Sequence, residues 1–187
     1  MWRWLLVAAA LLAASAAQAR TVQIVAFGDS ATAGYLVPHK DAYPAQLQAA
    51  LGAKGHDVEV RNEGVNGETT LGALRRFDAA IAPGTDIVLI ELGTNDLRMH
   101  VPRRTMEERL AEIIRSLHAR HIQVLVIGLG SLDLSAVASA NNVAYQQWKL
   151  PPGKYRAGDG AHFNAQGYAI VVKQTLPAVE ALIARVR

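Results

Sequence analysis

Short apolar runs alternate with amphipathic segments along this chain, and this alternation limits the folds that are open to it. The first and third runs are apolar almost throughout and end at a glycine, which is typical of buried strands. The predicted strands are Thr21–Phe27, Val58–Arg61, Asp86–Leu92, Gln123–Ile127 and Val143–Gln147. Strands separated by helices form βαβ units, so we expect a mostly parallel sheet with helices on both faces.

The segments between the runs have helical periodicity. The clearest helix is predicted to begin at a capping box formed by Thr105 and Glu108. Its apolar stripe consists of Met106, Leu110, Ile113, Ile114 and Leu117. A long final helix follows Asn164, which suits an N-cap, and we expect Pro177 to kink or split that helix.

The first 19 residues have the pattern of an export signal. Arg3 carries a positive charge, the apolar run 5–14 follows it, and Ala17-Gln18-Ala19 supplies small residues for cleavage after Ala19. The apolar run is shorter than the roughly 20 residues of a spanning helix, so a signal peptide is favoured over an uncleaved membrane anchor. We expect a domain over residues 20–187, a periplasmic or secreted location, and no stable membrane anchor.

Charge and cysteine content exclude several classes of function. The chain has 19 basic and 16 acidic residues, a formal net charge of +3, and the basic residues are scattered. We therefore expect no nucleic-acid binding. Because the chain contains no cysteine, it has no thiol nucleophile, no cysteine metal site and no disulfide. His118 and His121 lie at the end of the predicted central helix, where positive charge is favoured, and we predict no metal site there.

Four short blocks carry the residues that suggest chemistry. They are the segments 28–34 (GDSATAG), 66–68 (NGE), 93–96 (GTND) and 159–162 (DGAH). The first and third blocks come directly after the first and third predicted strands. Ligands of parallel α/β sheets bind beyond the carboxyl ends of the strands, so these two blocks are expected to meet at one edge.

A serine nucleophile needs a base and a group that orients the base. Ser30 follows a strand and lies between Gly28 and Gly34, which permit a sharp turn. His162 can take its proton, and Asp159 can hold the other imidazole nitrogen. Taken singly, Gly-Asp-Ser and Asp-Gly are also ordinary turn sequences.

An oxyanion that forms at the attacked carbonyl needs preorganised donors. The backbone N–H groups of Ser30 and Gly67 and the side-chain amide of Asn95 are the candidates. Asn66-Gly67 alone is a common tight turn, and Asn95-Asp96 can cap one. The four blocks together are the stronger indication, and they predict a serine hydrolase.

The chain resembles the SGNH (GDSL) hydrolase family, whose four blocks carry Ser, Gly, Asn and His. The wider matches are to exported bacterial arylesterases and acyl-CoA thioesterase/lysophospholipases, over almost the whole chain after residue 19. The resemblance implies a three-layer α/β/α sandwich with a five-stranded parallel sheet in flavodoxin-like order. Three departures stand out: Ala31 in place of leucine, Thr94 in place of glycine, and a short region around Gly130–Ser135.

The substrate is less constrained than the reaction. Apolar residues next to the blocks can line an acyl groove or can simply pack under loops: Tyr35, Leu36, Leu97, Met99 and Val101. We see no Arg/Lys fork that demands a phosphate or carboxylate. We expect a monomeric, cofactor-free esterase acting on small-molecule acyl esters of short to medium chain length, aryl esters included, with thioesters and lysophospholipids as further substrates.

Two other classes of function are compatible with the same blocks. The first is a carbohydrate or peptidoglycan O-acetyl esterase, which exposed aromatic residues near the site would favour. Trp148, Tyr145 and Tyr155 are its candidates. The second is a non-catalytic binding module on a hydrolase scaffold, which the intact set of serine, histidine, aspartate and asparagine disfavours.

Overall fold

A five-stranded sheet in which all strands run parallel forms the centre of the molecule. The computed structural model describes residues 20–149 and 153–186. The strands are β1 (Val22–Gly28), β2 (Val58–Gly64), β3 (Ile87–Glu91), β4 (Gln123–Leu129) and β5 (Ala144–Trp148). Their order across the sheet, β2-β1-β3-β4-β5, is the flavodoxin-like order. The predicted fold class is therefore confirmed.

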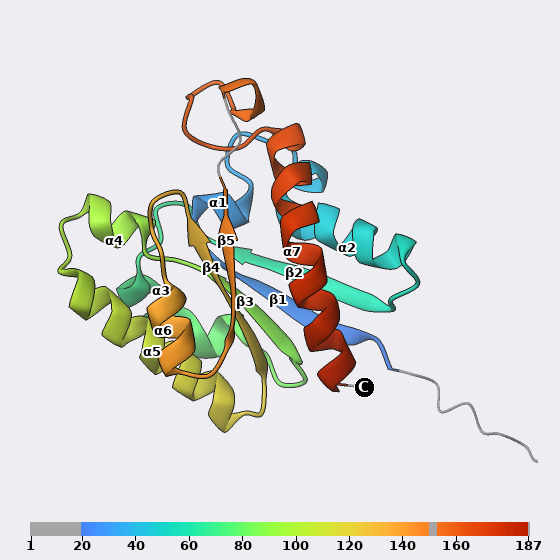
Figure 1. Cartoon of the computed structure of the whole chain (residues 1–187), viewed down its shortest axis with the longest axis horizontal. Helices are drawn as coiled ribbons and strands as arrows, with labels where there is room; N and C mark the ends of the chain where they lie inside the picture. Colours follow the sequence, from blue (N-terminus) through green and yellow to red (C-terminus); the bar gives the residue numbers. More distant parts are fainter. Residues whose placement is uncertain (1–19, 150–152, 187) are drawn as a thin grey trace, which may run out of the picture.

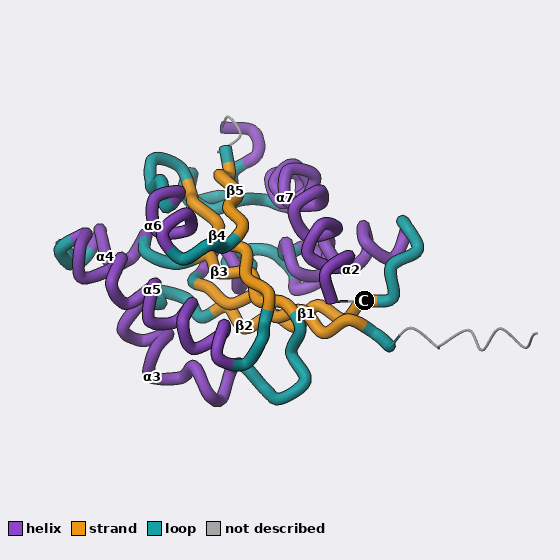
Figure 2. The backbone as a smooth tube through the Cα atoms, turned by 60° about the horizontal axis from the view of Figure 1, so that its bottom comes forward, coloured by secondary structure: helices purple, strands orange, loops and turns teal. Residues whose placement is uncertain are grey.

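Helices cover both faces of the sheet. The longer ones are α2 (Tyr43–Ala53), α3 (Thr70–Ala80), α5 (Arg103–Ala119), α6 (Ser135–Ala140) and α7 (Ala165–Val186). The short ones are α1 (Ser30–Ala33), α4 (Thr94–Arg98) and the 3₁₀ turns η1 (His39–Asp41) and η2 (Gly153–Tyr155). Helices α2 and α7 lie on one face, and α3, α5 and α6 lie on the other (Figure 1; Figure 2).

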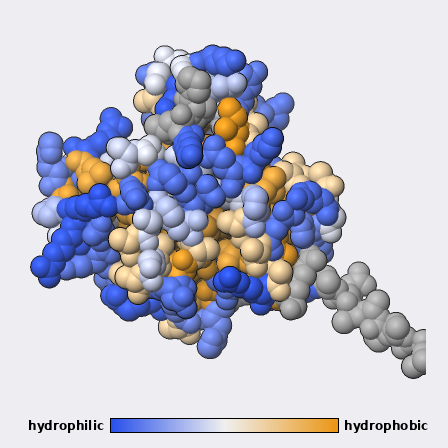
Figure 3. Space-filling model, in the orientation of Figure 1, coloured by the Kyte–Doolittle hydropathy of each residue, from blue (hydrophilic) through white to orange (hydrophobic). Residues whose placement is uncertain are grey.

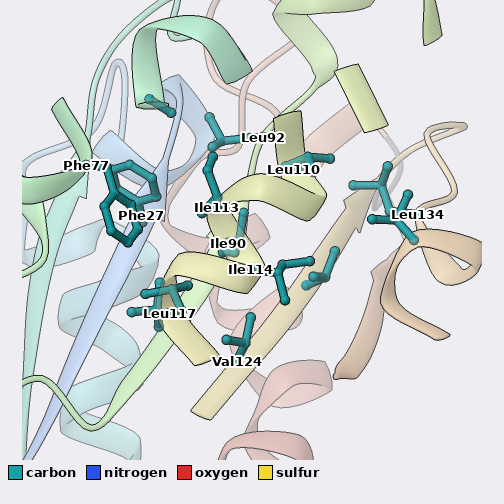
Figure 4. Packing of buried hydrophobic residues seen from close by; sticks show 14 of the residues in the cluster. Phe27, Phe77, Ile90, Leu92, Leu110, Ile113, Ile114, Leu117, Val124 and Leu134 are labelled. Carbon is teal, nitrogen blue, oxygen red and sulfur yellow. The ribbon is translucent and has the colours of Figure 1, made fainter. Parts of the chain in front are cut away.

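Alternate side chains of each strand enter two separate apolar clusters. From β1, Val25 and Phe27 pack with α3, α5 and α6, whereas Ile24 and Ala26 pack with α2 and α7. Strands that are buried on both faces must be apolar throughout, which explains the continuous apolar runs in the sequence. Figure 4 shows the first cluster, in which Phe27 lies against Phe77 and the stripe of α5 faces the sheet.

Helix α5 has the predicted apolar stripe but a different beginning. Its five stripe residues are fully buried, as expected. The helix starts two residues before Thr105, directly after Pro102, and no side chain caps it. Glu108 pairs instead with Arg104 one turn earlier, with 2.8 Å between Oε1 and Nε. The capping-box prediction was wrong because a flanking proline, whose φ angle suits a helix start, lies upstream.

The final helix is continuous. Asn164 caps α7, since its Oδ1 accepts the N–H of Gly167 at 3.0 Å. Pro177 lies inside a 22-residue helix without splitting it. The packing of α7 against β5 and α2, including buried Val171, Val179 and Leu182, outweighs the loss of one helical hydrogen bond.

The N-terminal signal predicted for residues 1–19 lies outside the described residues. Within the two described ranges, 20–149 and 153–186, no helix is both long enough and apolar enough to cross a membrane.

Candidate active site

The loop after β1 presents Ser30 as the first residue of the short helix α1. Asp29 precedes it and caps this helix, since its Oδ1 accepts the N–H of Ala31 at 2.9 Å. The turn requires a glycine at position 28. A Cβ on Gly28 would lie 2.1 Å from Oγ1 of Thr32 and 2.5 Å from the carbonyl oxygen of Glu91. The tight contact between this turn and β3 therefore explains the Gly-Asp-Ser sequence.

Ser30, His162 and Asp159 form a continuous chain of hydrogen bonds. Oγ of Ser30 lies 2.8 Å from Nε2 of His162, and Nδ1 of His162 lies 2.5 Å from Oδ2 of Asp159. The hydrogen bond to the His162 side chain, together with the backbone N–H groups of His162 and Ala161, lowers the pKa of Asp159 to about 2. An ionised Asp159 accepts a hydrogen bond from Nδ1–H of His162, and in this tautomer the Nε2 lone pair faces the serine hydroxyl.

The segment that carries His162 is held by its own backbone. The N–H of Ala157 donates to the carbonyl oxygen of His162 at 2.8 Å, and Asn164 donates to the carbonyl oxygens of Lys154 and Arg156 at 3.0 and 3.1 Å. The ring of Tyr35 packs edge-on against the imidazole, with 4.9 Å between ring centroids. These contacts hold the segment around His162 and its imidazole in place.

Of the three predicted oxyanion donors, Ser30 and Asn95 line the cleft, and the side-chain amide of Asn95 is already hydrogen-bonded. Its Nδ2 donates to Oδ2 of Asp29 and to the carbonyl oxygen of Glu68, both at 3.0 Å. A substrate oxygen must therefore share or replace one of these bonds. Gly67 lies in the exposed turn before Glu68 with a φ of +76°, a conformation that favours glycine. It does not line the cleft beside Ser30.

Asp96 has a structural role that the sequence did not reveal. It is fully buried, and its carboxylate accepts the backbone N–H of Thr70 at 2.8 Å and the Thr70 hydroxyl at 2.6 Å. Arg109 lies 3.7 Å from the same carboxylate. These contacts tie α4 to the start of α3 and to α5, and so hold Asn95 in place.

A buried pair of carboxyl groups lies beneath the nucleophile loop. Asp29 and Glu91 are 2% and 1% exposed, and the N–H of Asp29 donates to the carbonyl oxygen of Glu91 at 3.2 Å. Burial raises the pKa of Glu91 well above its usual value, and the neighbouring Asp29 raises it further. Thr32 donates to Glu91 at 3.2 Å. Glu91 therefore keeps its proton to a higher pH than an exposed glutamate does. A glutamate at the end of an apolar strand was the sequence signal for this pair.

This protonation predicts an unusual pH dependence of stability. Above the unfolded pKa of glutamate, about 4.3, the unfolded chain releases the proton that folded Glu91 keeps, so the contribution of Glu91 to stability falls as pH rises. Glu91→Gln removes this proton uptake. As pH rises, the free energy of unfolding of Glu91→Gln is expected to increase relative to that of wild type, by at most about 1.4 kcal/mol per pH unit. Urea unfolding from pH 6 to pH 9 measures the difference.

The matched control is Glu59→Gln, on the exposed side of β2. It should run parallel to wild type over the same range. A Glu91→Gln curve that also runs parallel to wild type would show that Glu91 is ionised in the folded protein.

The cleft beside the serine is small. Its volume is about 260 Å³, below the roughly 300–1,000 Å³ of pockets for drug-sized ligands. The cleft is lined by Asp29, Ser30, Ala31, Thr94, Asn95, Arg98, Leu129, Gly130, Ser131, Arg156, Ala161, His162 and Phe163. The short region after β4 thus contributes one wall directly, through 129–131.

The residues predicted to line an acyl groove are not among them. Tyr35 contacts His162 from outside the cleft, and Val101 is half-buried near α5. Leu36, Leu97 and Met99 are 53%, 39% and 67% exposed. Figure 3 shows an apolar patch over α4, where Leu97 lies. These side chains follow the blocks in sequence, but the turns of α1 and α4 direct them outward.

The aromatic residues considered for carbohydrate binding also lie elsewhere. Trp148 is fully buried, and its Nε1 donates to Oγ1 of Thr175 at 2.8 Å. The hydroxyl of Tyr145 donates to Asp133 at 2.9 Å. Neither they nor Tyr155 line the cleft, where Phe163 is the aromatic contributor.

Two arginines do line the cleft, so the sequence interpretation that no basic fork is present was wrong. Arg98 ends α4, and Arg156 lies between η2 and α7. They are far apart in sequence, and nothing local to either one indicates that they share a cleft with Ser30.

Comparisons with known proteins agree with this geometry. The model of the GDSL-like lipase/acylhydrolase family matches residues 26–149, which include Ser30, Gly67 and Asn95. An arylesterase of Vibrio mimicus is 37% identical over 101 residues, 54% of this chain and 50% of the relative. The esterase TesA of Pseudomonas aeruginosa is 33% identical over 123 residues, 65% of this chain and 60% of the relative. The matches thus span about half to three-fifths of the length of these relatives.

A solved structure shows the same fold. The esterase EstA from Pseudoalteromonas, in a structure inhibited by monoethylphosphonate, superposes with a TM-score of 0.78. It is 20% identical, and the alignment covers 87% of this chain and 98% of EstA.

Proposed function

Because the chain belongs to the GDSL-like lipase/acylhydrolase family, we propose that it hydrolyses acyl esters with a Ser30–His162–Asp159 triad. The observation that carries this proposal is the hydrogen-bonded chain from the serine hydroxyl through the imidazole to the carboxylate, at 2.8 and 2.5 Å. A nucleophile, a base and an orienting group in this arrangement perform acyl transfer on several unrelated folds.

In the first step, Nε2 of His162 takes the proton of Ser30, and Oγ attacks the ester carbonyl. Asp159 stabilises the imidazolium that forms. The carbonyl oxygen becomes an oxyanion, which accepts hydrogen bonds from the N–H of Ser30 and the side-chain amide of Asn95. The N–H of Gly67, the third predicted donor, takes part only if the turn at 66–67 moves towards the cleft. His162 then protonates the departing alcohol. Water, activated by the same imidazole, hydrolyses the acyl-enzyme and restores Ser30.

The dimensions of the cleft favour short acyl groups. A volume of about 260 Å³ has room for a short acyl group but not for a long chain, and residues 129–131 form part of its wall. We infer that short-chain alkyl and aryl esters are the substrates, in keeping with relatives that are named arylesterase and esterase. We expect slower hydrolysis of thioesters and lysophospholipids, because their acyl chains or leaving groups are larger than those of short-chain esters.

A panel of p-nitrophenyl esters tests this function. We expect acetate and butyrate to be hydrolysed with a kcat/KM at least about tenfold above that of octanoate, because a cleft of this size excludes the longer chain. Faster hydrolysis of octanoate would contradict the size argument. Activity confined to acetyl groups, with acetate released from acetylated glycans, would favour the O-acetyl esterase. No hydrolysis of any ester would favour the binding module.

Several expectations about the whole protein stay predictions. They are export with cleavage after Ala19, a periplasmic or secreted location, a monomeric state, and no binding to nucleic acid.

A further inference from the structure

Two positively charged side chains flank the proposed nucleophile. Arg98 and Arg156 line the same cleft as Ser30 and His162. Arg98 comes from the helix after β3, and Arg156 from the connection between β5 and α7, so they reach the cleft from different segments. A pair of guanidinium groups at one cleft is the arrangement that binds a carboxylate or a phosphate.

Neither arginine is neutralised by the part of the protein that the structure describes. Seven other arginines have a carboxylate oxygen within 4 Å: Arg20, Arg61, Arg76, Arg103, Arg104, Arg109 and Arg120. Over residues 20–149 and 153–186, no such ion pair forms at Arg98 or Arg156. Most arginines of this fold are thus paired, and two of the exceptions lie at the cleft.

Arg156 is oriented without losing its charge. Its Nη1 donates to the carbonyl oxygen of Ala161, and its guanidinium lies 5.4 Å from the ring centroid of Phe163. A carbonyl oxygen and an aromatic face hold a guanidinium in place but leave its formal charge uncompensated. The remaining N–H groups are left for a ligand.

Burial raises the pKa of Asp29 and the charge of nearby Arg98 opposes that rise, but over the described residues Asp29 forms no ion pair with either arginine. Asp29 is the one carboxylate among the described cleft residues, and it is 2% exposed and bonded to Ala31 and Asn95. Asp159 is bonded to His162 on the far side of the imidazole. A cleft with low-dielectric walls concentrates the field of the two arginines on an entering substrate.

We propose that Arg98 and Arg156 form an anion subsite in the active-site cleft, so that the preferred substrates are esters that carry a carboxylate or phosphate group. The inference rests on the proposed function and specifies its substrate class. The volume of the cleft accommodates a short acyl group together with one anionic group. The charge can belong to the acyl chain or to the leaving alcohol, and the experiment distinguishes the two positions.

Two matched pairs of esters provide the test. Mono-p-nitrophenyl adipate and its methyl ester differ by one charge on the acyl side. 4-Carboxyphenyl butyrate and its methyl ester differ by one charge on the leaving group. We expect wild type to prefer the anionic member of one pair by about tenfold or more in kcat/KM, as charge-assisted hydrogen bonds do. Equal rates within both pairs would overturn the subsite.

Variants assign the preference to the two arginines. Arg98→Gln and Arg156→Gln should each lower the ratio of anionic to neutral kcat/KM by about tenfold. Arg156→Lys keeps the charge and should restore most of the ratio. The control Arg104→Gln, whose side chain is 90% exposed on α5, should keep the wild-type ratio. An unchanged ratio in both glutamine variants would refute the assignment.

A binding measurement separates this inference from the proposed function. Titration calorimetry with phenyl phosphate should show binding to wild type that is weakened about tenfold or more in the double variant R98Q/R156Q. This holds even if no ester is hydrolysed, in which case only the proposed function fails. Ester hydrolysis without phenyl phosphate binding and without a charge preference would overturn the subsite alone.

Discussion

Ser30→Ala is expected to reduce kcat/KM for p-nitrophenyl butyrate by about 10⁴–10⁶-fold, because the acyl-enzyme can no longer form. Ser30 is the hydroxyl within hydrogen-bond distance of Nε2 of His162, at 2.8 Å. The loss should appear in kcat, since the serine forms a bond only as the reaction proceeds. Thermal unfolding should be close to that of wild type, because Ser30 is half-buried and removal of one hydroxyl leaves the turn at Gly28 intact.

A covalent probe gives a second measurement for the same residue. A fluorophosphonate should add one label to the peptide that contains Ser30 in wild type and none in Ser30→Ala. The control Ser139→Ala, on the exposed face of α6, should be labelled and active like wild type. Labelling of another serine, or retained activity in Ser30→Ala, would show that the nucleophile lies elsewhere.

His162→Gln is expected to have an effect of similar size, about 10⁴–10⁶-fold in kcat, because the serine proton then has no acceptor. Wild-type activity should also fall in acid, because a general base must be unprotonated to accept the serine proton. Asp159 does not cause this fall, because its pKa of about 2 keeps it ionised throughout the range. The residual activity of His162→Gln should therefore not show this fall of the rate at acid pH, which is called the acid limb. Steady-state rates from about pH 5 to about pH 8 measure both effects.

The control for this variant is His118→Gln, an exposed histidine near the end of α5. It should keep both the wild-type rate and the wild-type pH profile. An acid limb that persists in His162→Gln would assign that limb to another group. The double variant Ser30→Ala/His162→Gln should be no worse than either single variant, since residues that act as one unit are strongly non-additive.

The Glu91→Gln variant tests stability, and its effect differs in kind from the losses of activity expected for the Ser30 and His162 variants. Asp29 and Glu91 support the nucleophile loop from below, and the Glu91→Gln experiment reports on stability rather than on the chemical step. The separation is possible because Glu91 is 1% exposed and does not line the cleft.

Much of the fold could be predicted because its signals are local. Continuous apolar runs mark the strands that are buried on both faces, and the stripe of α5 has the period of a helix. The errors also have local causes. Pro102 starts α5 before the expected capping box, and α7 passes through Pro177 because its packing against β5 and α2 outweighs one lost hydrogen bond. The short helices α1 and α4 were missed because four or five residues carry too little periodicity to detect.

In the candidate site too, some residues could be predicted from local sequence and others could not. The positions of Ser30 and Asn95 directly after predicted strands were enough to expect a common edge, since parallel strands end on one side. The groove residues were wrong because adjacency to a block in sequence does not determine which way a side chain points from a short helix. Met99, next to the third block, is 67% exposed for this reason.

By itself, the sequence determined the alternation of elements, the parallel sheet and the four blocks that identify the chemistry, because each depends on residues within one short segment. Only the tertiary structure decided which distant side chains share an environment: the buried Glu91 beside Asp29, the amide of Asn95 held by Glu68, and Arg98 with Arg156 at the cleft. The physical reason is that burial, pairing and electric field depend on neighbours in space, and segments far apart in the chain supply those neighbours only after the sheet has assembled.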